Sequence, residues 1–241
     1  MKWFFWSAVF LIAYTYVGYA CWLRLRLLWR SYPVRRGAYT PSVSIAMVVR
    51  NEEQVLETKL QSLLALDYPP CQVIVVSDGS TDRTEEILRE YGRDSRFQLI
   101  LKQFSQGKAS GLNDAMNLAH GEIVVFTDAR QQIEPTAVRL LAENFADPEV
   151  GCVSGELMLG DATTGESSQG LGLYWRIEKQ VRELEAASGS TVGATGAIYA
   201  VRRELFTSIP QETILDDVYL PLGSGATGKA CGFRWTRAGM G

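Results

Sequence analysis

Polar and charged side chains follow three apolar runs of the chain, at the points where these runs end. Asn51 and Glu52 come after residues 42–49, Asp78 after residues 72–77, and Asp128 and Arg130 after residues 123–127. Near the C-terminus, the acidic pair Asp216 and Asp217 precedes another apolar stretch. Because His120 is the only histidine, sites built on several histidines are excluded, and acid–base chemistry falls to carboxylates.

The apolar runs predict the elements that position these side chains. Residues 42–49, 72–77, 97–102 and 123–127 are typical of buried parallel strands, and amphipathic helices are expected over 51–66, 83–91 and 107–119. This alternation predicts an α/β fold with a doubly wound, mostly parallel sheet flanked by helices. In such folds ligands bind at the carboxyl ends of the strands, so we expect the polar clusters to meet there.

Two charged residues at this edge suggest nucleotide chemistry. Asp78 directly follows an apolar strand, where its carboxylate can accept hydrogen bonds from a base or ribose. Lys108 opens the next helix and is interpreted either as a phosphate contact or as a solvated charge. Neither G-x-G-x-x-G nor G-x-x-x-x-G-K-[ST] follows any of the four predicted strands, which argues against dehydrogenases and P-loop proteins.

The N-terminal region has the pattern of a membrane anchor. Residues 3–23 carry no charge, which predicts a transmembrane helix, with aromatic residues gathered at both ends. Five arginines follow within residues 24–36, so the positive-inside rule predicts a single-pass protein of the cell membrane whose remaining part is cytoplasmic. A cleaved signal peptide is the alternative, but it has the opposite charge order.

Length and composition limit the rest of the organisation. The 241 residues suit one α/β domain with appendages. We place the α/β domain at 42–222, and the appendages at 1–30 (anchor and basic flank), 31–41 (connector) and 223–241 (tail). A net charge of −3 disfavours nucleic acid as a partner. The tail is Gly-rich without apolar periodicity, so we expect it to lack regular structure, as a truncated or frameshifted segment would.

Several segments taken together resemble the family-2 glycosyltransferases, which are inverting enzymes of GT-A fold, including polysaccharide-synthase-type catalytic domains. The similar segments are VVRNEEQVLETKLQSLLALDYP, VIVVSDGSTDRT, GKASGLNDAMNLAHGEIVVFTDA, TGAIYAVRREL and ILDDVYLP. They occur in order between about residues 42 and 222, and their joint occurrence is far more specific than any one motif.

The resemblance implies roles for individual residues. Asn51, Glu52 and Asp78 would bind the nucleotide of the donor, and Asp128 would hold the first position of a metal-binding D-x-D. Asp217 would be the catalytic base, with Asp216 beside it. The loop containing Gly193, Thr195 and Gly196 matches the family's loop beside the acceptor site. Chemistry agrees, since inverting transfer needs a carboxylate base and a cation for the departing diphosphate.

The third residue of the D-x-D motif departs from this pattern. Arg130 stands where the family has an acid, and a cation does not ligate a metal. Either Asp128 alone contributes a carboxylate to Mg²⁺ or Mn²⁺, or Arg130 itself approaches the diphosphate.

These observations predict a membrane-anchored enzyme that moves a sugar from a nucleotide-sugar donor, UDP-linked, to an acceptor hydroxyl. The acceptor would be a glycan or a lipid-linked molecule. Two alternatives stay open: a membrane-tethered remnant that binds a nucleotide without turnover, and a sugar nucleotidyltransferase. The latter would want a Gly-rich phosphate loop where this chain has Arg50, Asn51 and Glu52.

Overall fold

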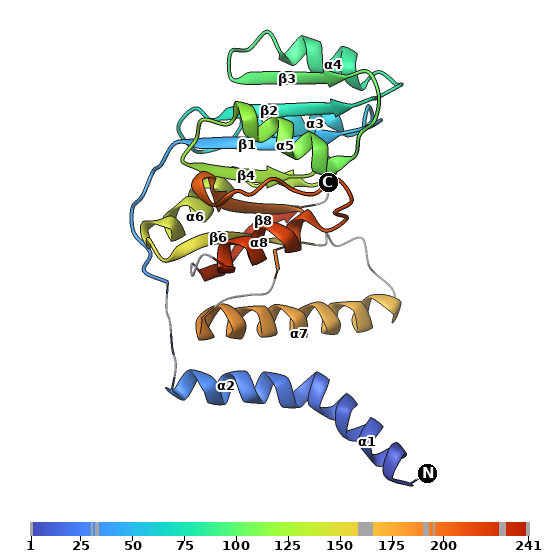
Figure 1. The fold of residues 1–241 in the computed structure, drawn as a ribbon, viewed down its shortest axis with the longest axis vertical. Helices are drawn as coiled ribbons and strands as arrows, with labels where there is room; N and C mark the ends of the chain where they lie inside the picture. Colours follow the sequence, from blue (N-terminus) through green and yellow to red (C-terminus); the bar gives the residue numbers. More distant parts are fainter. Residues whose placement is uncertain are drawn as a thin grey trace.

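The computed structural model describes residues 2–29, 31, 34–158, 166–189, 193–194, 196–226 and 230–239, and its centre is a β-sheet (Figure 1). The strands of this part are β1 (Val43–Val49), β2 (Gln72–Asp78), β3 (Phe97–Lys102), β4 (Ile123–Thr127), β5 (Gln132–Ile133), β6 (Val150–Met158), β7 (Ile198–Arg202) and β8 (Ala230–Gly239). They form one sheet in the order β3-β2-β1-β4-β7-β6-β8-β5.

Helices cover both faces of the sheet and extend beyond it. They are α1 (Lys2–Ala13), η1 (Tyr14–Gly18), α2 (Tyr19–Trp29), α3 (Leu56–Leu64), α4 (Thr84–Tyr91), α5 (Lys108–Leu118), α6 (Ala137–Ala142), η2 (Glu143–Ala146), α7 (Glu166–Ser188), η3 (Arg203–Leu205) and α8 (Asp216–Ala226). Apolar residues of α3, α4 and α6 pack on one face, and those of α5 and α8 pack on the other.

The predicted parallel sheet flanked by helices is confirmed for strands β1 to β4. β1 lies between β2 and β4 and pairs with both in parallel, and β2 pairs in parallel with β3. Alternate side chains of a strand point to opposite faces, so Ile45 and Met47 join the core under α3 while Ala46 joins the core under α5. Both faces are buried, which explains why these strands read as unbroken apolar runs.

The second half of the sheet differs from the mostly parallel sheet that the sequence predicts. β7 pairs antiparallel with β4 and with β6, so the sheet is mixed. The reversal places the beginning of β7 beside the end of β4, where Ile198 is the partner of Thr127. Gly196, just before β7, is thereby brought to the edge at which Asp128 follows β4.

The C-terminal residues also differ from the expected irregular tail. α8 continues past residue 222 to Ala226, and β8 pairs in parallel with β6 and antiparallel with β5. Strand pairing uses backbone N–H and C=O groups, which a segment offers whether or not its side chains alternate. The absence of apolar periodicity therefore did not prevent residues 230–239 from entering the sheet.

The N-terminal helical run lies apart from the sheet, with α7 between them (Figure 1). α2 packs against α7, where Leu23 is buried and the Tyr19 hydroxyl donates to Glu185 Oε1 at 2.7 Å. α1 has no buried residue, and its Trp3 and Phe4 side chains are 86% and 84% exposed. A π-helical turn, η1, divides the run into helices of 12 and 11 residues.

The transmembrane helix predicted at residues 3–23 finds no support in these helices. Within the described part of the chain, none combines the length and the apolar composition that crossing a bilayer requires.

Candidate functional site

A lysine joins two of the predicted site carboxylates at the carboxyl edge of the sheet. Lys108 is the first residue of α5, and its Nζ lies 3.1 Å from Asp128 Oδ1 and 3.1 Å from Asp216 Oδ1. Burial by itself lowers the pKa of Lys108, but the two carboxylates outweigh burial and the pKa is raised. Lys108 is therefore a stable cation between the end of β4 and the start of α8.

Asp217 lies beside the loop that precedes β7. A Cβ atom added to Gly196 would stand 3.1 Å from Asp217 Oδ2, and the Ala194 N–H donates to the Asp217 carbonyl at 2.8 Å. Gly193 faces the next residue of α8, since an added Cβ would stand 3.3 Å from Val218 Cγ2. Thr195, the other residue predicted for this loop, lies outside the described residues.

The surroundings of Asp217 make it a stronger base than an ordinary aspartate. Burial raises its pKa, the neighbouring Asp216 carboxylate raises it further, and Lys108 opposes both. A raised pKa means a greater affinity for a proton, which a carboxylate needs in order to deprotonate a hydroxyl.

Asp216 is buried and has two partners, a lysine and a tyrosine hydroxyl. Besides Lys108 at Oδ1, the Tyr199 hydroxyl donates to its Oδ2 at 2.8 Å. The Tyr199 ring stacks on Phe126 with 5.0 Å between ring centroids, so the hydroxyl is held in place by the core. Sequence reasoning missed Tyr199, whose only signal is a hydroxyl within the apolar run that forms β7.

The turn after β1 is tied to the turn after β2. Asn51 adopts a left-handed backbone with φ 53°, its N–H donates to Ser80 Oγ at 3.2 Å, and its Oδ1 accepts from the Thr81 N–H at 2.8 Å. The side chain of Glu52 points instead toward the turn after β4, where Arg130 Nε donates to Glu52 Oε1 at 2.9 Å. The structure thus brings Glu52 and Arg130 together as an ion pair.

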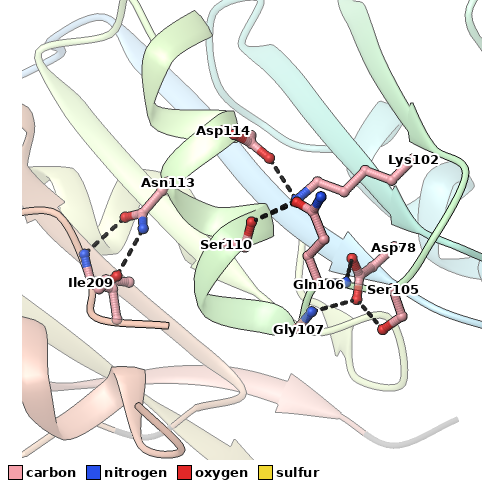
Figure 2. A network of polar contacts seen from close by, with 9 residues as sticks. All are labelled: Asp78, Lys102, Ser105, Gln106, Gly107, Ser110, Asn113, Asp114 and Ile209. Carbon is pink, nitrogen blue, oxygen red and sulfur yellow. Dashed lines mark hydrogen bonds and ion pairs between the residues drawn. The ribbon is translucent and has the colours of Figure 1, made fainter. Parts of the chain in front are cut away.

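Asp78 anchors the loop that leads into α5, as Figure 2 shows. Its Oδ1 accepts from the Gln106 N–H at 2.8 Å, and its Oδ2 accepts from the Ser105 hydroxyl at 2.7 Å and the Gly107 N–H at 2.9 Å. Burial raises the pKa of Asp78, but these hydrogen bonds and Lys102 outweigh it, and the pKa is lowered.

Glycine at position 79 permits this arrangement. Gly79 has φ 67°, and an added Cβ would stand 2.5 Å from the Ser105 nitrogen. Asp78 therefore positions the start of α5, and with it Lys108. That Asp78 also contacts a nucleotide stays a prediction.

A lysine that sequence reasoning missed lies beneath the turn after β4. Lys59, on the apolar face of α3, is 1% exposed, and its Nζ donates to Thr127 Oγ1 at 2.8 Å and to the Gln131 carbonyl at 2.6 Å. Burial lowers its pKa to about 7, against the opposing charge of Asp128. The signal in the sequence was a charge among Leu56, Leu60 and Leu63, which we read only as an apolar face.

The acidic side chains fit a divalent cation only together with a ligand's phosphates. Among the residues that the structure describes, no three His, Cys, Asp or Glu side chains gather into a potential metal site. Asp128 is the carboxylate at the D-x-D position, while Arg130 is directed to Glu52. One carboxylate is a sufficient protein contribution for Mg²⁺ when substrate phosphates supply further oxygens.

The chain is similar in sequence to known proteins. The pattern that defines Glycosyl transferase family 2 matches residues 44–209. A poly-beta-1,6-N-acetyl-D-glucosamine synthase of Staphylococcus epidermidis is 29% identical over 155 residues, which are 61% of this chain and 38% of that protein. A beta-monoglucosyldiacylglycerol synthase of Nostoc sp. is 29% identical over 188 residues, 75% of this chain and 40% of that protein. The chain thus spans about two fifths of the length of these curated relatives.

Solved structures share the fold. A mannosyltransferase from Pyrobaculum calidifontis in complex with GDP-Man and Mn²⁺ has a TM-score of 0.80 at 24% identity, covering 97% of this chain and 67% of that one. The glucosyl-3-phosphoglycerate synthase from Mycobacterium tuberculosis, solved with Mn²⁺, UDP and glucosyl-3-phosphoglycerate, has a TM-score of 0.57 at 20% identity, covering 86% and 78%. The family match covers more than half of the chain, and the chain therefore belongs to glycosyl transferase family 2.

Proposed function

We propose that this protein transfers a sugar from a nucleotide-sugar, UDP-linked, to an acceptor hydroxyl with inversion at the anomeric carbon. The observation that carries the proposal is the position of Asp217, a carboxylate of raised pKa against Gly196 and beside the cluster of Lys108, Asp128 and Asp216. The names of the two curated relatives, a polysaccharide synthase and a glycolipid synthase, support a glycan or lipid-linked acceptor.

We assign a role to each group in the reaction. Asp217 accepts the proton of the acceptor hydroxyl while the hydroxyl oxygen forms its bond to the anomeric carbon. On the opposite side of that carbon the bond to the diphosphate breaks, and the electron pair leaves with the nucleoside diphosphate. Lys108 and Arg130 place positive charge at this edge, where the negative charge of the leaving group develops.

A divalent cation bound by Asp128 and the donor phosphates would neutralise the departing diphosphate. For Asp128 to bind a cation, its ion pair with Lys108 must loosen, which leaves Lys108 available to the phosphates. Tyr199 retains Asp216 in place during this exchange, since its hydroxyl bond does not involve Asp128.

Asp217→Asn tests the assignment of the base. The amide has the same shape but does not accept the proton, so we expect transfer to fall at least about a hundredfold while donor affinity stays within a few-fold. Glu212→Gln, the same chemical change at an exposed position shortly before α8, is the matched control. Transfer by Asp217→Asn at a tenth or more of the parent rate would place the base elsewhere.

A panel of nucleotide-sugars, tested for binding, slow hydrolysis and transfer with the detergent-solubilised chain, identifies the donor. Binding with neither hydrolysis nor transfer would favour the alternative, a membrane-tethered protein that binds a nucleotide without turnover. Formation of a nucleotide-sugar from a nucleoside triphosphate and a sugar phosphate would favour a nucleotidyltransferase.

We further propose that residues 2–29 anchor the protein in the cell membrane, with the sheet on the cytoplasmic side. The support is the exposure of the large apolar side chains of α1, which water solvates poorly, and the arginines that follow them. Deleting residues 2–29 should release the protein from liposomes of cell-membrane composition in a flotation assay. Continued flotation of the shortened chain would contradict the proposal.

A further inference from the structure

Lys59 is a charged side chain in a position that otherwise suits an apolar one. It belongs to the buried face of α3 with Leu56, Leu60 and Leu63, and only 1% of it is exposed. Transfer of an ammonium group from water into a protein interior costs several kcal/mol, and hydrogen bonds recover only part of it. A methionine would fill similar space without that cost, so packing alone does not account for a lysine here.

The two hydrogen bonds of Lys59 go to the two ends of one turn. Thr127, whose Oγ1 accepts from Lys59, immediately precedes Asp128, and Gln131, whose carbonyl accepts from Lys59, immediately follows Arg130. The ammonium group therefore bridges the base of the segment that presents Asp128 and Arg130 at the edge of the sheet.

The contacts at the tip of this turn are of a different kind. Asp128 pairs with Lys108, and the 72% exposed side chain of Arg130 pairs with Glu52. All four groups are ones that we assign to the donor site, so these pairs must rearrange when a diphosphate enters. The bonds from Lys59 lie beneath the turn and do not compete with a ligand.

Thr127 extends the connection to the other half of the site. While its Oγ1 accepts from Lys59, its own hydroxyl donates to the Ala197 carbonyl at 2.9 Å. Ala197 follows Gly196, which lies against Asp217. One buried chain of hydrogen bonds thus runs from α3 to the turn after β4 and on to the loop before β7.

We propose that Lys59 is a positioning residue for the diphosphate part of the donor site, holding the 127–131 turn so that Asp128 and Arg130 are in place before the ligand binds. The inference rests on the proposed function, because it takes a nucleoside diphosphate as the ligand. Groups held in their binding geometry beforehand cost the ligand less ordering free energy, and small displacements of such groups weaken binding strongly.

Lys59→Met tests the inference, because it keeps most of the length of the side chain and removes its charge and donors. Calorimetry gives the affinity for UDP or GDP, whichever the parent binds, and saturation-transfer NMR gives the affinity for the matching nucleoside. We expect the diphosphate affinity to fall about tenfold or more, the nucleoside affinity to stay within about twofold, and the melting temperature not to fall. Lys2→Met, which removes the same charge from an exposed position of α1, should change none of these values.

Three results would overturn the inference. Unchanged diphosphate affinity in Lys59→Met would show that the turn needs no support from Lys59. Equal losses of affinity for the nucleoside and the diphosphate, together with a lower melting temperature, would show that Lys59 has a merely structural role. A parent protein that binds neither diphosphate would reject the proposed function itself, and this inference with it.

If Lys59→Met does not fold, Thr127→Val decides the question. It removes the shared hydroxyl from the same chain of hydrogen bonds and leaves α3 intact. A selective loss of diphosphate affinity in this variant supports the inference, and an equal or absent loss contradicts it.

Discussion

At the scale of single residues, the acidic pair at the start of α8 divides two tasks between neighbours. Asp216 is buried and bound by Tyr199 and Lys108, so its carboxylate is held in place and pairs with the charge of Lys108. Asp217 is partly exposed, faces Gly196, and its pKa is raised by burial and then by Asp216. Two adjacent carboxylates thereby have different roles because their surroundings differ.

The raised pKa of Asp217 predicts the pH dependence of transfer. A base works only when deprotonated, so activity should be lost as pH falls through the pKa of Asp217, and this loss should begin above the usual range for an aspartate. Asp216→Asn removes one cause of the raised pKa and should move the acidic limb of kcat/KM to lower pH. An acidic limb that stays in place or moves to higher pH would contradict the assignment.

Arg130 gives a second prediction at this scale. Arg130→Asp restores the acid of the D-x-D motif but puts a third carboxylate near Asp128 and Glu52, so without metal the site repels a diphosphate. We expect lower activity than the parent and a UDP affinity that depends more strongly on added Mn²⁺. Arg130→Gln removes the positive charge without adding a negative one, so its activity should lie between those of the parent and of Arg130→Asp. Equal or higher activity at the same metal concentration would indicate a passive Arg130.

At the scale of elements, the site is made of turns that are bonded to one another. The turn after β1 is joined to the turn after β2 through Asn51, and to the turn after β4 through Glu52. α5 is joined to the end of β2 through Asp78, and to the loop before α8 through Asn113, which exchanges hydrogen bonds with the backbone of Ile209 (Figure 2). Displacement of one turn therefore displaces its neighbours.

Asp78→Ala tests this coupling. The substitution leaves the N–H groups of Gln106 and Gly107 without their acceptor, and α5 loses the anchor of its first turn. We expect nucleotide binding to weaken by roughly 1.5–3 kcal/mol, the range for a hydrogen bond with a charged partner. Unchanged UDP affinity by calorimetry, in a variant whose circular dichroism matches the parent, would reject the role of Asp78 in the donor site.

Asp78→Asn separates direct contact from positioning. The amide retains one acceptor oxygen, so much of the loop geometry persists while the negative charge is removed. If Asp78 acts only through the 105–107 loop, the loss in Asp78→Asn should be smaller than in Asp78→Ala. Equal losses would indicate that the carboxylate itself contacts the nucleotide.

At the scale of the whole molecule, the sheet continues into segments far apart in the sequence. β8 lies between β6 and β5, so the last described residues form an inner strand next to the edge strand β5. Pairing with β6 runs from Val150 to Met158, with two irregularities in register. The C-terminal segment is in this respect part of the fold.

Deleting residues 230–241 tests the contribution of β8. The backbone groups of β6 and β5 that pair with β8 would lose their partners, so we expect a melting temperature lower by more than about 5 °C, equivalent to roughly 2 kcal/mol for a domain of this size. Nucleotide affinity should also fall, because β8 pairs with β5, which directly follows the 127–131 turn of the donor site. An unchanged melting temperature would show that β8 adds no stability.

Local pattern determined much of this protein. Runs of β-branched and apolar residues predicted β1 to β4 within a residue or two, and the spacing of leucines predicted α3, because strand and helix periodicities are visible in a short window. The residues that follow the parallel strands were expected to meet at one edge, because the carboxyl ends of parallel strands lie at the same edge of a sheet. Only the tertiary structure showed that Lys108 joins Asp128 to Asp216 and that Tyr199 holds Asp216.

Long-range pairing decided the remainder. The position of Gly196 against Asp217 follows from the antiparallel pairing of β7 with β4, and the entry of residues 230–239 into the sheet follows from pairing with β6. Backbone groups are alike in every sequence, so a strand's partner is set by which edge the rest of the fold leaves open. A buried Lys59 likewise reads as a surface charge until the fold places oxygen acceptors around it, because burial is a property of neighbours that are distant in the chain.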